Sequence, residues 1–217
     1  MGVGLFGKLP AKRDFIEYSV DRALMEKWDP WLQQAVATSR ELLGQDWLEI
    51  YLQAPIWRFW LGAGICSKPV VGALMPSVDG VGRYFPLSLV WVGEDAIPAP
   101  EQDEQVDWFA AAEEVLLGAL GEGVRYESVQ AALSLLPELR RGGDDPDSSI
   151  PGVFRQLRIG KLDDFYRTSS CWWVPSPDDG TTPARALLRH GLPAPEDYVT
   201  MLAGERNGRM AEAVGKG

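Results

Sequence analysis

The stretch GALMPSVDGVGRYFPLSL, residues 72–89, decides the fold, because it places two apolar strand-like runs on either side of a short polar loop. Within the loop, Gly80 and Gly82 permit positive φ angles, while Pro76 and Pro86 each fix φ and withhold a backbone donor. These residues predict an ordered connection between two strands, and they mark the loop as the first place to look for function.

Three side chains of this loop can form polar contacts: Ser77, Asp79 and Arg83. One interpretation is structural, an internal ion pair or side-chain bonds to the loop backbone that hold its shape. The other is functional: with Asp14 and Lys8 brought near by the sheet, these residues form a polar contact surface for a protein partner. The residues alone leave both interpretations open.

The segments around the loop predict an α/β (α+β) fold, with a mostly antiparallel central sheet of about five strands flanked by helices. Runs 70–75 and 85–92 are almost uniformly apolar, which is typical of strands covered on both faces. The candidate strands, separated by Gly and Pro, are 3–9, 15–20, 47–52, 56–61, 70–75, 84–92 and 170–174.

The clearest helix is predicted over residues 103–120, whose apolar stripe is interrupted by Glu113. An earlier helix has Asp29 as its expected N-cap and Pro30 as its first residue, and ends at Gly44. Leu24 and Trp28 suggest a helical turn before it. Shorter helices are predicted at 127–136, 183–191 and 196–202.

The chain is expected to form a single domain over residues 1–217. A motif-rich core covers 1–140, and a C-terminal extension, 150–217, packs on it. The Gly/Asp/Pro-rich loop of residues 140–149 is the expected seam between them.

Composition narrows the class of partner. The 217 residues carry a formal net charge of −10 without any run of Lys or Arg, so neither nucleic acid nor an anionic membrane surface is expected as a partner. No apolar run approaches the roughly 18 residues of a membrane span, and no membrane insertion is expected. Two widely separated cysteines and no secretory leader favour a cytoplasmic location.

The sequence offers no convincing catalytic constellation. Residues 2–8 match the glycine and lysine spacing of a phosphate-binding loop, but Leu9 occupies the position of the Mg²⁺-binding hydroxyl residue. The only histidine, His190, lies where a helix is expected to end. Cys66 and Cys171 are expected to be small buried hydrophobic residues.

Metal and cofactor sites are not expected either. Acidic residues 144–147 lack the spacing of a calcium-binding loop and are interpreted as a solvated surface. We therefore expect no catalytic, cofactor-binding or metal-binding residues, and no small-molecule substrate.

Four blocks together resemble the TagF family, also called ImpM, which is associated with bacterial type VI secretion. They are GKLPAKRDF at 7–15, WDPWL at 28–32, APIWRF at 54–59 and MPSVDGVGRYFPL at 75–87. Their order and combination is specific, whereas one block alone would not be. The resemblance covers residues 2–92 well and is looser beyond them.

The resemblance implies a non-enzymatic cytoplasmic regulator that represses type VI secretion after translation by binding the FHA-domain scaffold protein of the system. It also implies a fold similar to longin or SNARE-like domains. Five motif positions are carried over as candidates for protein interaction: Lys8, Asp14, Ser77, Asp79 and Arg83. Two alternatives stay open: a structural or accessory subunit of the secretion apparatus, or a hydrolase that uses Ser77.

Overall fold

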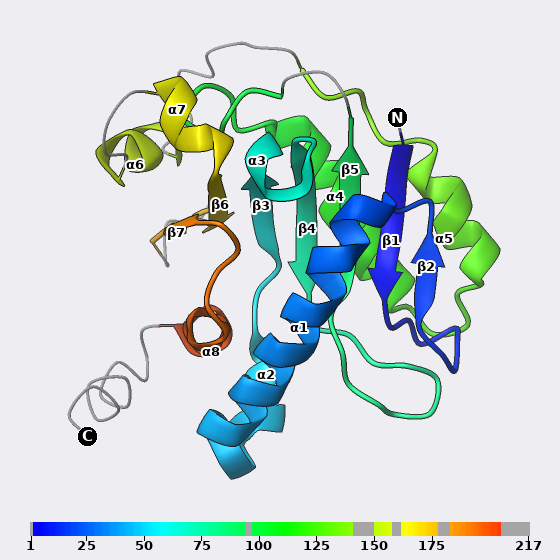
Figure 1. Ribbon diagram of the computed structural model, residues 1–217. Helices are drawn as coiled ribbons and strands as arrows, with labels where there is room; N and C mark the ends of the chain where they lie inside the picture. The colour runs from blue at the N-terminus through cyan, green and yellow to red at the C-terminus, as the bar shows by residue number, and fades with distance from the viewer. Residues whose placement is uncertain (1, 94–96, 141–149, 158–161, 178–182, 205–217) are drawn as a thin grey trace.

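In the computed structural model, residues 2–93, 97–140, 150–157, 162–177 and 183–204 are described. Within these ranges, seven strands form one antiparallel sheet in the order β2-β1-β5-β4-β3-β6-β7 (Figure 1). This confirms the predicted fold class, although the sheet has more strands than the five or so expected. The strands are β1 (Gly2–Gly7), β2 (Ile16–Tyr18), β3 (Trp57–Leu61), β4 (Val70–Met75), β5 (Leu87–Val92), β6 (Ser169–Val174) and β7 (Arg185–His190).

Helices cover both faces of the sheet, so the molecule has three layers (Figure 1). On one face lie α1 (Arg22–Leu43), α2 (Trp47–Gln53), α3 (Ala63–Cys66) and α8 (Pro195–Ala203), with a short 3-10 turn, Gly44–Asp46, between α1 and α2. On the other lie α4 (Val106–Ala119), α5 (Tyr126–Leu133), α6 (Ile150–Leu157) and α7 (Leu162–Arg167).

The central strands are buried on both sides because each face has its own apolar core. Every residue of β3 and β4 is buried, which explains why the sequence of β4 is uniformly apolar instead of alternating. On the α1 face, Trp28 packs on Phe59 of β3 and stacks with Trp172 of β6. The Trp28 indole also donates a hydrogen bond to Ser88 Oγ of β5 at 3.0 Å.

The predicted start of the first helix is wrong. Asp29 is not an N-cap: the helix begins eight residues earlier, where Asp21 Oδ1 accepts hydrogen bonds from the amides of Ala23 and Leu24. Pro30 therefore lies inside α1. A proline in this position lacks one amide donor, so its helical conformation must be maintained by the packing of the surrounding helix face.

Two other segments differ from expectation. Residues 47–52 were predicted as a strand, but they form α2, in which Trp47 and Tyr51 stack one helical turn apart on the buried side. Residues 183–191 were predicted as a helix, but Arg185–His190 is strand β7, paired along its length with β6. His190 accordingly lies at the end of a strand and not at a helix C-terminus.

The helices predicted at 103–120, 127–136 and 196–202 correspond to α4, α5 and α8. The acidic segment 144–147 lies outside the described residues. The division into a core of 1–140 and an extension of 150–217, and the likeness to longin domains, stay predictions. None of the described helices has both the length and the apolar character that a membrane crossing requires.

Candidate protein-interaction site

The loop between β4 and β5 is folded tightly on itself and on the β1–β2 connection. The Asp79 amide donates to the Arg83 carbonyl, and an isolated bridge pairs Val78 with Tyr84. The Gly80 amide donates to the Lys12 carbonyl at 2.7 Å. A Cβ atom on Gly80 would lie 2.8 Å from the Pro10 carbonyl oxygen, so close approach requires glycine there.

Asp79 is the centre of the loop, and its side chain is fully buried. Its Oδ2 lies 3.0 Å from Lys8 Nζ and 2.7 Å from Arg83 Nε. Its Oδ1 accepts hydrogen bonds from the amides of Val81, at 3.0 Å, and Arg83, at 2.9 Å. One carboxylate thus joins Lys8, the residue directly after β1, to both sides of the loop turn.

These contacts hold Asp79 in its charged form. Burial by itself would raise the pKa of its carboxyl group, but the hydrogen bonds from the Arg83 amide, the Lys8 and Arg83 side chains and the Val81 amide outweigh that effect. The net result is a pKa well below the ordinary value for an aspartate. Conversely, the bond to Asp79 raises the pKa of the Arg83 guanidinium.

Ser77 and Tyr51 fix the inner end of the loop. Ser77 Oγ donates to the Lys8 carbonyl at 2.7 Å, and the Ser77 amide donates to Tyr51 Oη at 2.9 Å. The Tyr51 hydroxyl in turn donates to the Ser77 carbonyl at 3.1 Å. Because the Ser77 hydroxyl is buried and its proton is donated to a backbone oxygen, this side chain is positioned as a structural group and not as a nucleophile.

Arg83 extends from the buried Asp79 carboxylate to the protein surface. Its side chain is 55% exposed, and its Nη2 contacts the Arg13 carbonyl and lies 3.5 Å from Asp14 Oδ1. Two apolar side chains beside it are also half exposed: Phe15, whose ring packs on Phe85, and Val81 at the tip of the loop. The outer rim therefore combines a positioned guanidinium with accessible apolar groups.

All five residues expected at the site are brought together here. Lys8, Asp79 and Arg83 form one ion-paired group, Ser77 bonds to the backbone of Lys8, and Asp14 is the outer partner of Arg83. The internal ion pair that the sequence suggested is thus present. Contact of these residues with a protein partner stays a prediction.

Sequence reasoning missed a second buried group of charges on the opposite face. Arg58 of β3 lies 2.6 Å from Glu113 Oε1 of α4 and 3.4 Å from Glu104 Oε1. The Trp173 indole donates to the same Glu104 oxygen at 3.2 Å. The signal was available: an arginine within an otherwise apolar strand and a glutamate on the apolar stripe of a helix are each costly to bury alone, which indicates that they pair.

The two cysteines are buried and positioned for packing. Burial raises the pKa of the Cys66 thiol to about 11, and burial also raises the pKa of Cys171, so neither thiol is activated. His190 lies on β7, an edge strand, whereas Ser77 follows the central strand β4. The described residues contain no cluster of three or more His, Cys, Asp or Glu side chains that could hold a metal ion.

The fold and this site define an α/β protein with a two-faced antiparallel sheet and a rigid, ion-paired surface loop. The chain belongs to the TagF family: the model of the TagF N-terminal domain, described as type VI secretion system-associated, matches residues 4–136. That range includes the whole loop site. The family resemblance expected from four sequence blocks is thereby confirmed.

A solved structure agrees with this assignment. The chain is 27% identical to PA0076 of Pseudomonas aeruginosa PAO1, known from a crystal structure, with a TM-score of 0.71 and 94% of each chain covered. The similarity therefore extends beyond the matched N-terminal region to β6, β7 and α8. No match was found among curated proteins.

Proposed function

We propose that this protein represses type VI secretion after translation by binding the FHA-domain scaffold of the secretion system, and that the loop of residues 76–83 is part of the contact surface. Membership of a family associated with type VI secretion supports the general role. In this proposal the protein acts in the cytoplasm, without catalysis.

The observation that carries the proposed surface is the way in which Arg83 is held. Its guanidinium is anchored by the buried Asp79 carboxylate, yet more than half of the side chain is exposed, as are about half of the Phe15 and Val81 side chains. Such a group loses little conformational entropy when a partner binds, because its position is already fixed. Arginine and aromatic side chains of this kind are frequent energetic centres of protein interfaces.

The test is affinity capture of tagged protein from a lysate with an active type VI system. Val81→Asp places a charge on the exposed rim without removing any contact of Asp79. We expect it to abolish recovery of the FHA-domain scaffold. Leu52→Asp, on α2, is the matched control, since Leu52 is a similarly exposed aliphatic side chain that is not part of the loop. Equal recovery with both variants would place the contact elsewhere.

The cellular phenotype tests the repressor role separately from the surface. Deletion of the gene should raise secretion, and excess protein should lower it. A structural or accessory subunit predicts the opposite, because its deletion abolishes secretion. The hydrolase alternative, which would use Ser77, is disfavoured by the buried hydrogen bond from its hydroxyl to the Lys8 carbonyl.

A further inference from the structure

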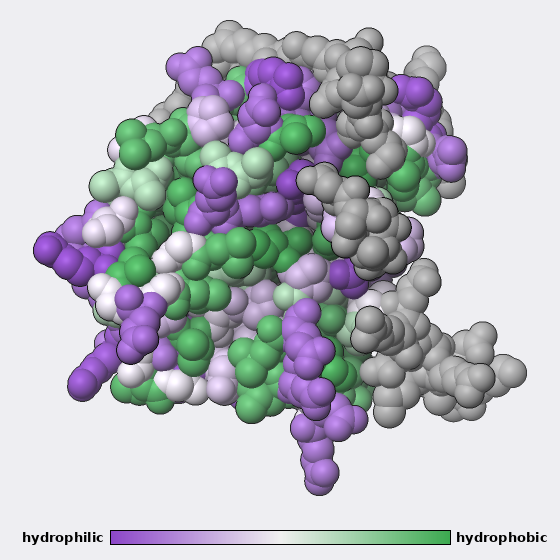
Figure 2. Space-filling view, turned by 180° about the vertical axis from the view of Figure 1, so that it is seen from behind, coloured by the Kyte–Doolittle hydropathy of each residue, from purple (hydrophilic) through white to green (hydrophobic). Residues whose placement is uncertain are grey.

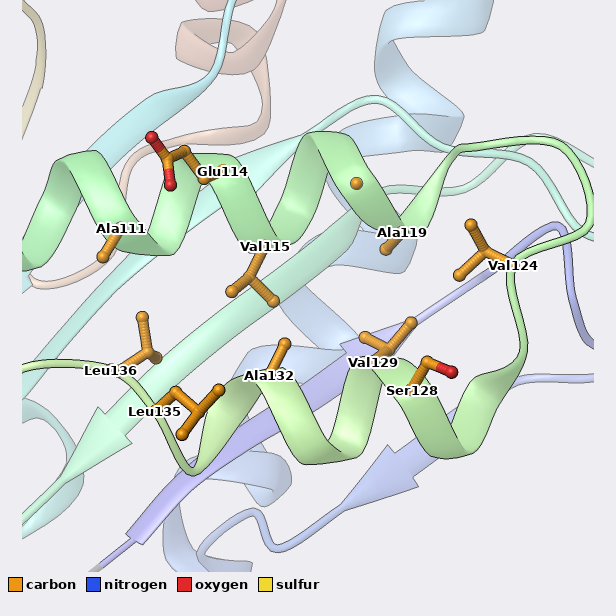
Figure 3. A pocket seen from close by; sticks show the side chains of 11 residues that line it. Ala111, Glu114, Val115, Ala119, Val124, Ser128, Val129, Ala132, Leu135 and Leu136 are labelled. Carbon is orange, nitrogen blue, oxygen red and sulfur yellow. The ribbon is translucent and has the colours of Figure 1, made fainter.

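A second surface feature lies on the face of the sheet opposite α1, where a groove of about 410 Å³ runs between α4 and α5. Figure 3 shows Val115 and Ala119 of α4 facing Val129 and Ala132 of α5 across it. The remaining lining residues include Gly118, Val124, Leu135 and Leu136, and none of the lining belongs to the loop site.

The groove is apolar and accessible. Leu135, at one end, is 82% exposed, and Leu117 on α4 is 58% exposed. Seen from this side, the molecule displays apolar side chains over a broad area between hydrophilic ones (Figure 2). Exposed leucines beside a trough of small residues are typical of a surface that another element covers.

The segment of chain that forms the groove is acidic, although two of its acidic residues are paired, Glu113 with the buried Arg58 and Glu127 with Arg125. Residues 106–139, which contain both helices, include six acidic residues and one basic residue, Arg125. This short segment therefore carries a net charge of −5, half of the −10 of the whole chain. Of these acidic residues, Glu114 lines the groove. A partner with basic side chains is favoured at such a rim.

We infer that the α4–α5 groove binds an amphipathic helix of a partner protein, with its apolar face in the groove and lysine or arginine side chains beside the acidic rim. The two groove walls are helices whose small lining residues recur every three or four positions, Ala111, Val115 and Gly118 on α4 for example. A third helix can lay apolar residues at positions i, i+3 or i+4, and i+7 into such a trough.

Two other occupants fit less well. A second copy of the chain would bring the same acidic segment to both sides of a symmetric contact, and like charges there would repel. The residues after 204 follow α8, which packs on α1 and α2 across the sheet from the groove. The inference goes beyond the proposed function, because it concerns a surface separate from the loop.

The test uses labelled helical peptides of about 16 residues, long enough for an amphipathic helix to bind two turns or more. The first peptide has a leucine face and lysines elsewhere. The second replaces the lysines by glutamate, and the third replaces the leucines by serine and keeps the lysines. Fluorescence anisotropy against the full-length protein should show binding of the first peptide, weaker by about tenfold or more for each of the others.

Variants of the protein locate the binding. No atom lies within 4 Å of a Cβ built on Gly118, so Gly118→Leu fills the groove with little disturbance of the fold, and Gly118→Ala is its matched control. We expect Gly118→Leu to weaken binding of the first peptide by about tenfold, whereas Gly118→Ala leaves it nearly unchanged. Leu135→Ser, at a largely exposed position, should also weaken binding and provides a second variant if Gly118→Leu fails to fold.

Three results would overturn the inference. The leucine–lysine peptide could bind wild type and the Gly118→Leu and Leu135→Ser variants equally, which would place the contact outside the groove. The serine–lysine peptide could bind as tightly as the leucine one, leaving only charge attraction. Sedimentation could instead reveal a dimer that Leu135→Ser dissociates, which would make a second copy the occupant.

Discussion

At the scale of single residues, Asp79 determines what the loop can present. Its carboxylate accepts hydrogen bonds from the side chains of Lys8 and Arg83 and from two loop amides. The position of the exposed Arg83 guanidinium is therefore fixed by a buried carboxylate. The structural and functional interpretations of the loop are therefore compatible. An internal ion pair is what makes the outer rim rigid enough to contact a partner.

The lowered pKa of Asp79 makes this anchor sensitive to acid. A carboxyl group whose pKa is lower in the folded than in the unfolded state stabilises the fold above the unfolded pKa, and this contribution disappears as pH falls through the folded value. We expect Asp79→Asn to melt below the wild type at pH 7 and the difference to shrink below about pH 4. Thermal melts of both proteins between pH 7 and pH 2 measure this difference. A constant difference over that range would contradict the explanation.

Arg58 should be far more important for stability than an exposed arginine. Replacing it by alanine removes the buried cation that pairs with Glu113 at 2.6 Å and with Glu104 at 3.4 Å, and loss of one partner of a buried pair costs about 3–5 kcal/mol. Arg22→Ala is the control, because the Arg22–Glu26 pair on α1 is exposed and worth less than about 0.5 kcal/mol. Urea unfolding of both variants gives the two values. Similar losses would show that the Arg58 contacts contribute little.

At the scale of elements, glycines with different surroundings should respond oppositely to alanine. Gly118 lies near the end of α4 with open space around its Cα, so Gly118→Ala should stabilise the protein by about 0.5–1 kcal/mol through higher helix propensity. Gly80→Ala forces a methyl group against the Pro10 carbonyl, and overpacking of this kind costs about 1–3 kcal/mol. Chemical denaturation tests both, and a loss of stability in Gly118→Ala would show that groove geometry depends on the glycine.

The sequence predicted those elements in which local preference and tertiary environment agree. The β4–loop–β5 unit and α4 have strong turn signals or a long apolar stripe, and both were predicted correctly. In contrast, Arg185–His190 is rich in helix-forming Ala, Leu and Arg, yet it pairs with β6 because that strand has a free edge there. Residues 47–52 were assigned by their apolar content, while the burial of Trp47 and Tyr51 follows helical spacing.

For the candidate site, too, the residues that the local sequence marks were predicted, whereas a charge pairing elsewhere that depends on tertiary contacts alone was not. The loop residues lie close in sequence, and their side-chain chemistry in a glycine-rich turn was sufficient to find them. Lys8 and Asp14 lie in the connection between β1 and β2, which the pairing of β1 with β2 and β5 brings beside the loop. The pairing of Arg58 with Glu113 was missed because it joins a strand to a helix that is distant in sequence. The residues near each charge do not indicate which oppositely charged residue it will contact in the folded protein.

At the scale of the whole molecule, the segment matched by the family model depends on chain beyond it. The matched residues end at 136, but Trp172 of β6 is fully buried between Trp28 and Phe59 in the core under α1. From the same later part of the chain, the Pro193 carbonyl accepts a hydrogen bond from the Trp31 indole at 2.8 Å. The core under α1 thus closes only when β6 and the residues after it are in place.

We therefore expect a fragment of residues 1–140 not to fold by itself, although it contains all four motif blocks and the whole loop. Without β6, the β3 edge and the Trp28–Phe59 surface would be open to water, and exposed apolar area of this extent favours collapse without fixed packing. The fragment should bind ANS, lack a near-ultraviolet circular dichroism signal and show no sharp thermal transition, while the full chain unfolds cooperatively. Addition of a separate fragment of residues 141–217 should restore part of the signal if the two parts form one folding unit. A sharp transition in the first fragment alone would instead make 1–140 an independent domain, and the extension would then be an addition to a fold already complete.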